Sequence, residues 1–268
     1  MNNKYLNITD GGFNHIKSYY HEFSKPYIEY NKEDNKIYYE QPLDTNYDYV
    51  EIGGIKWATK CIGATSPYTY DAWFFQWGET QGHINLGGSI DYAVTWETTP
   101  FNNNNFDYNE SYWKTISGNV CDNNGCLLSE YDAATQLMGK DWRIPNHNEL
   151  SILLEHRLEI TDRVVTGFDG TIIQLQTTSG IGVVNNVQGL CFGETTTSKD
   201  KILFIPIHGF VWKNSPKIVS IGNSLFLFGS NIYADEPNNA CILAYHMNQY
   251  LMTGGLRASA RNILPIKL

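Results

Sequence analysis

A short acidic and amide-rich segment, Glu236–Asn239, carries residue types that can bind a hard cation. The carboxylate of Glu236 and the amide of Asn238 supply oxygen atoms that can coordinate Ca²⁺ together with sugar hydroxyls. A calcium site needs roughly six to eight oxygen ligands, and Asp235 and Asn239 alone do not complete that number. We therefore expect a polar turn here, and we predict neither a metal site nor a cofactor in this chain.

Two cysteines, Cys121 and Cys126, flank a turn sequence that contains Asn124 and Gly125. The Asn-Gly pair favours a tight hairpin turn, which brings the two thiols close enough for a disulfide or for half of a zinc site. No second Cys or His pair at metal-ligand spacing accompanies them, so zinc is not expected. An ordinary hairpin with reduced thiols is the expected structure, and an oxidised clip is the alternative.

The seven histidines show no arrangement typical of a catalytic or metal site. His147 and His156 lie nine residues apart on one expected helix, which puts them on opposite sides of its axis. The sequence has no HExxH, GxSxG or GxxxxGK[ST] motif, and no cysteine pairs with a histidine in a local catalytic signature. We therefore predict that the chain is not an enzyme.

The C-terminal third is rich in side chains that form adaptable recognition surfaces. Tyr233 and Tyr250 offer apolar area with little loss of rotamer freedom, and Arg257 offers a forked hydrogen-bond donor. We predict that one face of this region binds an external glycan or protein, and a set of solvated loops is the alternative. The candidate binding residues are Asn231, Tyr233, Asp235, Asn238, His246, Asn248, Tyr250, Arg257 and Ser259.

Two helices with recognisable start signals are expected in the middle of the chain. In the first, Ser129 stands at the N-cap position and Gly139 follows an apolar face over residues 131–138. In the second, Asn146 can cap the helix and Glu149 occupies the reciprocal capping-box position, before a leucine-rich face that reaches residue 158.

Most of the remaining chain has the pattern of short antiparallel strands. Near the N-terminus, residues 27–30 and 36–40 are expected to pair as a two-stranded ribbon, which is only marginally stable alone. Because helices stand in the middle of a strand-rich chain, the sequence predicts an α+β fold. Further strands are expected at residues 49–52, 55–59, 201–210, 224–228, 241–246 and 263–268.

The composition predicts a folded, acidic protein. Charged residues make up 18% of the 268 residues, the net charge is -9, and no basic stripe is present, so nucleic acid is not an expected partner. No apolar run approaches the ~18 residues of a membrane span, and residues 1–7 do not begin a signal peptide. Neither membrane insertion nor signal-dependent export is therefore expected.

Several spaced segments carry a resemblance to one family. In chain order they are Trp57–Thr59, Phe75–Thr80, Tyr131–Ala134, Gly139–Pro145, Phe204–Pro206, Asn238–Ala240 and Arg261–Ile266. Together they resemble the Fibrobacter succinogenes major paralogous domain, a family found in Bacteroidetes and their phages. The resemblance spans roughly residues 49–268. It implies a C-type-lectin-like fold with two helices, small antiparallel sheets, and a first strand near Val50 that pairs with the last strand near Ile266.

The resemblance also implies a function, because several members of this family are phage receptor-binding or bacterial surface proteins. We expect residues 1–47 to be an attachment or oligomerisation segment that contacts other virion proteins, and residues 48–268 to be the lectin-like domain. The chain would then belong to the phage particle, as a fibre, decoration or receptor-binding component that attaches to the host, and it could form a homo-oligomer. The alternatives are a purely structural virion protein and a bacterial surface adhesin.

Overall fold

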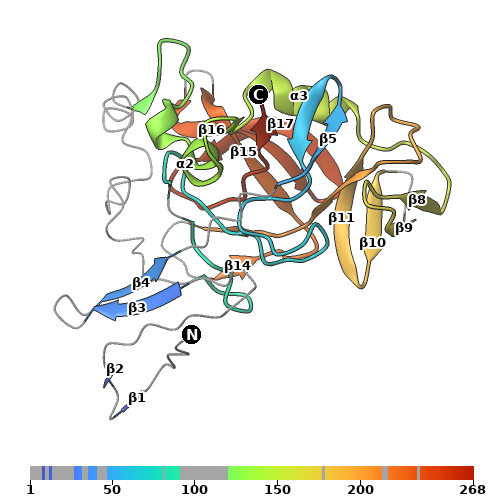
Figure 1. Cartoon of the computed structure of the whole chain (residues 1–268). Coiled ribbons are helices and arrows are strands. Elements are labelled where there is room, and N and C mark those ends of the chain that lie inside the picture. Colours follow the sequence, from blue (N-terminus) through green and yellow to red (C-terminus); the bar gives the residue numbers. More distant parts are fainter. Residues whose placement is uncertain are drawn as a thin grey trace.

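Figure 1 shows the computed structural model of the chain. The structure describes residues 47–80, 82–90, 120–176, 179–212, 217–233 and 236–268, together with the backbone of four short strands nearer the N-terminus. These strands are β1 (Ile8–Thr9), β2 (Gly12–Phe13), β3 (Tyr27–Asn31) and β4 (Lys36–Glu40). The antiparallel pairing of β3 with β4, with Tyr27 opposite Glu40, confirms the predicted ribbon.

A four-stranded antiparallel sheet joins the two ends of the main domain. Its order is β5-β6-β18-β7, and Ile266 of β18 lies opposite Trp57 of β6. The first and last strands therefore share a sheet but do not pair directly, which corrects the prediction. The reason is the turn at Gly53 and Gly54, with φ of 60° and 74°, which folds β6 back onto β5. The strands are β5 (Tyr49–Ile52), β6 (Ile55–Ala58), β7 (Trp142–Arg143) and β18 (Ile266–Lys267).

A three-stranded antiparallel sheet carries the C-terminal third, in the order β15-β16-β17. Its strands are β15 (Leu225–Tyr233), β16 (Glu236–His246) and β17 (Gln249–Leu256). Both faces of β16 are buried: Leu243 packs in one apolar cluster with Leu150 and Leu153 of helix α3, and Ile242 packs in another with Trp77. Figure 1 shows this sheet near the centre of the molecule, next to α3.

A five-stranded antiparallel sheet curls until its two edges meet. Its order is β12-β11-β10-β9-β8. Ile202 N, just before β12, donates to Thr166 O of β8 at 3.0 Å, and Thr166 N donates to Lys199 O at 2.8 Å. The curled sheet encloses its own apolar cluster around Ile173 and Phe204. The strands are β8 (Val164–Thr166), β9 (Ile172–Leu175), β10 (Ile181–Val184), β11 (Val187–Phe192) and β12 (Leu203–Pro206); a separate pair is β13 (Phe210–Val211) with β14 (Ile218–Val219).

The first predicted helix divides into a 3₁₀ turn, η1 (Ser129–Tyr131), and the short helix α2 (Ala133–Met138). Its N-cap is Asp132 and not Ser129, because the Asp132 carboxylate accepts a hydrogen bond from Thr135 N at 2.9 Å. The same carboxylate accepts from Ile144 N at 2.9 Å, so it ties α2 to the segment that leads into the second helix. Gly139, with φ of 95°, ends α2 as expected.

The second helix, α3 (His147–Glu155), has the predicted capping box. The Asn146 side chain accepts from Glu149 N at 3.0 Å, and the Glu149 carboxylate accepts from Asn146 N at 2.7 Å. The helix ends at Glu155, three residues before the expected Leu158, which is buried outside the helix in the cluster of the curled sheet.

The described part of the chain is thus an α+β fold that is mostly antiparallel sheet, with two α-helices, as the sequence predicts for the fold class. The tryptophans of the spaced segments hold its core together. The Trp77 indole donates to Gly229 O at 2.8 Å, and the Trp142 ring packs edge-on against Tyr47 with centroids 6.0 Å apart. These contacts join parts of the chain that lie far apart in sequence.

Candidate functional site

The predicted binding residues do not form one face, because they lie at opposite ends of the β15-β16-β17 sheet. Tyr233 ends β15 and Asn238 lies near the start of β16, whereas His246 ends β16 and Asn248 lies in the turn between β16 and β17. From its first to its last residue, β16 comprises 11 residues, which at about 3.3 Å per residue is roughly 35 Å. The single-face prediction is therefore wrong, since successive hairpin turns fall at opposite ends of an antiparallel sheet.

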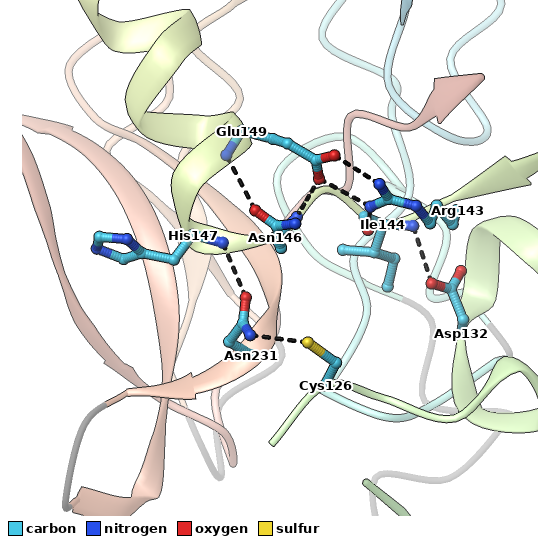
Figure 2. Close-up of polar contacts among 8 residues, drawn as sticks. All are labelled: Cys126, Asp132, Arg143, Ile144, Asn146, His147, Glu149 and Asn231. Atoms are coloured by element: carbon cyan, nitrogen blue, oxygen red, sulfur yellow. Dashed lines mark hydrogen bonds and ion pairs between the residues drawn. The ribbon is translucent and has the colours of Figure 1, made fainter. Parts of the chain in front are cut away.

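Asn231 uses its side chain inside the fold, as Figure 2 shows. Its Oδ1 accepts from the backbone N of His147 at 2.8 Å, and its Nδ2 donates to Cys126 Sγ at 2.8 Å. The amide therefore fastens β15 to the start of α3. Beside it, the Arg143 guanidinium donates to both Glu149 oxygens at 2.7 and 2.5 Å. Asn231 is thus a structural residue, which corrects its assignment to a binding face.

Arg257 and Ser259 are fully buried, each with 0% exposure, so neither can contact an external partner. The guanidinium of Arg257 lies 4.1 Å from the ring centroid of Trp77, and its Nη1 donates to Pro237 O at 2.8 Å. Stacking on the indole and the hydrogen bond to a backbone carbonyl hold this planar cation inside the domain. Arg257, whose guanidinium was predicted to bind an external partner, is a core residue instead.

The remaining candidates at this end of the sheet also contact the domain itself. The Tyr233 ring packs over Gly254 of β17, where an added Cβ would lie 2.5 Å from the ring. The Asn238 carbonyl accepts from Arg257 N at 3.0 Å. Glu236, at the start of β16, accepts a hydrogen bond from the Asn239 amide. Asp235 lies outside the described residues, and Glu236, Asn238 and Asn239 lie in strand β16, so the polar turn expected over these residues is wrong.

The opposite end of the sheet presents an unusual turn. Met247 and Asn248 connect β16 to β17 and have φ of 51° and 62°. Asparagine adopts this left-handed conformation readily, but methionine rarely does. The Met247 side chain is 79% exposed. Non-glycine residues held in such conformations cluster at functional sites, and this turn is therefore a candidate.

Two side chains of the domain hold this turn in place. The Tyr245 hydroxyl donates to Asn248 Oδ1 at 3.0 Å, and the His246 ring nitrogen Nδ1 lies 2.8 Å from Ser224 Oγ. His246 is half-buried, with its ring centroid 6.1 Å from that of Phe226. The turn is thus fixed from both of its ends, while its tip stays exposed.

A groove of about 600 Å³ opens beside this turn. Its volume lies within the roughly 300–1,000 Å³ range of small-ligand pockets. Two of the predicted binding residues, Asn248 and Tyr250, line it, so the structure keeps this part of the predicted surface together. The full lining is Arg157, Glu159, Ser179, Asn248, Gln249, Tyr250 and Leu251.

Tyr250 forms a rigid wall of the groove. Its hydroxyl donates to Ser179 O at 2.5 Å, and its ring centroid lies 5.0 Å from that of Tyr245. Burial is the main cause that raises the pKa of Tyr250 above its usual range; Tyr245 adds to the shift and Arg157 opposes it. The phenol therefore stays protonated at neutral pH.

Arg157 and Glu159 supply the charged part of the groove. Arg157 Nη2 lies 2.9 Å from Glu159 Oε1, and its guanidinium lies 5.7 Å from the Tyr250 ring centroid. Both side chains are partly exposed, so the ion pair contributes little to folding stability. It instead places a forked donor beside a carboxylate acceptor, next to the amide of Gln249. Such a set can pair with neighbouring hydroxyl groups of a sugar or with peptide groups.

Sequence reasoning missed the residues that complete the groove from the other side. Arg157 and Glu159 follow α3, and Ser179 precedes β10, so they reach β17 only through the packing of the curled sheet. Neighbouring positions in the sequence do not reveal such a meeting. The local signal in the sequence is that two charged residues, Arg157 and Glu159, stand on either side of Leu158 at the end of the leucine-rich face.

The cysteine segment forms the predicted hairpin. Cys121 lies opposite Leu127, and Gly125 has φ of 71° in the turn. Because Cys126 is offset by one position from Leu127, the two thiols point to opposite faces of the hairpin, and both are free. Burial raises the pKa of Cys121 to about 11.

No three His, Cys, Asp or Glu side chains in the described ranges gather as possible metal ligands. Among the helices that the structure describes, none has the length and apolar character needed to cross a membrane.

Comparisons with protein-family models, curated proteins and solved structures gave no match to this chain. The described part of the chain has an α+β, mostly antiparallel fold, with a groove beside the turn between β16 and β17.

Proposed function

We propose that the chain is a non-enzymatic phage virion protein, a fibre, decoration or receptor-binding component, whose domain binds a host-surface glycan or protein. We further propose that residues 48–268 have a C-type-lectin-like fold. The spaced segments that resemble the Fibrobacter major paralogous domain support this assignment. Two α-helices, small antiparallel sheets, and a first and a last strand of the domain that share one sheet are features that such a fold would have.

The observation that carries the proposal is the groove beside the Met247–Asn248 turn. It combines a rigid aromatic wall, Tyr250, with exposed amide groups and the Arg157–Glu159 pair. Aromatic rings together with a few placed polar groups are typical of binding sites for sugars and peptides. Leu251, which is 47% exposed, adds apolar area at the rim.

The test is binding of the labelled full chain to isolated cell envelopes from a panel of Bacteroidetes strains. Arg157→Ala and Gln249→Ala each remove a groove side chain, and each should lower the affinity about tenfold, as expected for central contacts. Arg163→Ala and Gln174→Ala are matched controls, because both residues are exposed and neither lines the groove. They should leave binding unchanged.

Chemical treatment of the envelopes separates the two ligand classes. Periodate, which cleaves sugar diols, should abolish binding if the ligand is a glycan, and protease should abolish it if the ligand is a protein. Failure of every envelope to bind, or equal losses in the groove variants and the controls, would contradict the proposed function. The purely structural alternative predicts instead that the groove variants fail to join the virion.

A further inference from the structure

The groove beside the Met247–Asn248 turn carries one positive and one negative charge. Among the described residues that line it, Arg157 and Glu159 are the charged ones. Arg157 Nη2 lies 2.9 Å from Glu159 Oε1, so the two charges cancel one another locally. Burial holds the pKa of Tyr250 above its usual range, and the phenol is therefore uncharged at neutral pH. These described lining residues thus present no net charge to a ligand.

Charge disfavours both an acidic and a basic ligand in this groove. The chain has a net charge of -9, so its field repels anions that approach from solution. An acidic sugar or a phosphate would also have to take the guanidinium of Arg157 away from Glu159. A basic ligand that approaches Glu159 would meet the positive charge of Arg157 instead. A neutral ligand meets neither obstacle.

The polar groups of the groove match the hydrogen-bonding roles of hydroxyl groups. Arg157 can only donate and Glu159 can only accept, whereas a hydroxyl group does both. Asn248 Oδ1 already accepts from the Tyr245 hydroxyl at 3.0 Å, so Asn248 can offer the donors of its Nδ2 to a ligand. Gln249, which is exposed beside it, carries both a donor and an acceptor. The groove therefore suits a ligand with several neighbouring hydroxyl groups.

The apolar area of the groove is small for a protein partner. Leu251, which is 47% exposed, is the aliphatic residue among the described lining residues. The Tyr250 side chain is engaged inside the domain, because its hydroxyl donates to Ser179 O and its ring centroid lies 5.0 Å from that of Tyr245. Protein interfaces bury ~800 Å² per partner around an apolar core that is poor in charge. A mostly polar groove of small-ligand size fits a sugar better, with the C–H face of the sugar on Leu251.

We propose that the ligand of the groove is a neutral glycan, and that one of its hydroxyl groups bridges Arg157 and Glu159. The hydroxyl oxygen accepts a hydrogen bond from the guanidinium, and the hydroxyl donates its hydrogen to the carboxylate. The assignment rests on the proposed function, since it names the ligand class of the same groove. Glu159 then sets the selectivity, because it occupies the guanidinium that an acidic sugar would otherwise bind.

The first test uses glycans released from the envelopes of a strain that binds the chain. Anion exchange separates them into a neutral and an acidic fraction, and each fraction competes with envelopes for the labelled full chain. The neutral fraction should compete more strongly. Failure of the neutral fraction to compete, or stronger competition by the acidic fraction, would overturn this inference, and so would binding that survives periodate but not protease. These results would leave the proposed function standing, whereas a panel without any binding envelope would contradict the function and this inference together.

Glu159→Gln tests the role of the carboxylate, because it removes the charge and keeps the size of the side chain. Its affinity for the neutral fraction should fall about tenfold, and competition by the acidic fraction should rise, since the charge of Arg157 is no longer cancelled. Glu194→Gln is the matched control, with the same change of net charge at an exposed residue that does not line the groove. It should keep the wild-type preference for the neutral fraction.

Thermal unfolding separates a change of selectivity from a change of folding. Both glutamine variants should unfold at nearly the wild-type temperature, because the Arg157–Glu159 pair is partly exposed and contributes little to stability. An unchanged preference in a folded Glu159→Gln protein would overturn the inference, since the carboxylate would then not set the selectivity.

Discussion

His208 is a fully buried histidine whose neutral form the fold requires. Burial lowers its pKa from 6.5 to about 4, and Asp71 opposes this shift only in part. Between pH 6.5 and about pH 4, this histidine binds a proton in the unfolded chain but not in the folded chain. Lowering the pH from 6.5 to about 4 should therefore lower the free energy of unfolding, by about 3 kcal/mol in total.

His208→Phe keeps an aromatic ring beside Tyr70, whose ring centroid lies 6.3 Å away, and removes the titration. Urea unfolding of both proteins from about pH 7 to about pH 4 measures the effect. The wild-type protein should lose more stability than the variant over this range. Parallel curves would show that His208 does not carry the pH dependence.

The two candidate residues with the clearest chemistry, Arg257 and Tyr250, had different outcomes for a physical reason. An arginine can bind an external partner or stack on an aromatic ring inside the domain. Arg257 stacks on Trp77, which lies 180 positions earlier in the chain. Tyr250 lies beside a hairpin turn, which the fold exposes. Residue type therefore predicts what a side chain can do, whereas long-range packing decides whether it faces solvent.

At the scale of elements, the capping box of α3 stabilises the start of this helix through hydrogen bonds between Asn146 and Glu149. Asn146→Ala removes the acceptor that satisfies Glu149 N, and should lower the free energy of unfolding by about 1 kcal/mol. Asn146→Asp keeps an acceptor at the same place and should cost much less. Chemical denaturation of the three proteins measures this difference, and equal losses in both variants would contradict the role of the cap.

Elements that depend on neighbouring residues could be predicted, and those that depend on distant packing could not. The β3-β4 ribbon, the capping box and the Cys121–Cys126 hairpin each follow from turn or cap residues within a few positions. The shift of the first N-cap from Ser129 to Asp132 has a tertiary cause. Asp132 also accepts from Ile144 N, and the sequence around Ser129 does not contain that contact.

At the scale of the whole molecule, Tyr47 belongs to the folded domain and not to the segment before it. Its hydroxyl accepts from Gly63 N at 3.1 Å, and Lys60 Nζ lies 5.0 Å from its ring centroid. A chain that begins at Tyr47 should fold, and should be more stable by about 2–3 kcal/mol than one that begins at Tyr49. Thermal and urea unfolding of the two shortened chains compare them. Equal stability would put the boundary after Tyr47, as the sequence suggested.

The whole-molecule arrangement also explains why the groove could be predicted only in part. One wall comes from the turn between β16 and β17, where polar and aromatic residue types indicated recognition. The other wall comes from the chain after α3 and before β10, which the curled sheet brings into position. The sequence could predict the first wall because its residues are consecutive.

The most direct test of the central claim maps the surface that a ligand protects. Hydrogen exchange of the full chain should be measured with and without solubilised envelope material from a strain that binds it. We expect protection at residues 157–159 and 246–251, which line or flank the groove, and unchanged exchange at residues 236–240 at the far end of the sheet. Protection at residues 236–240 with none beside the groove would contradict the account.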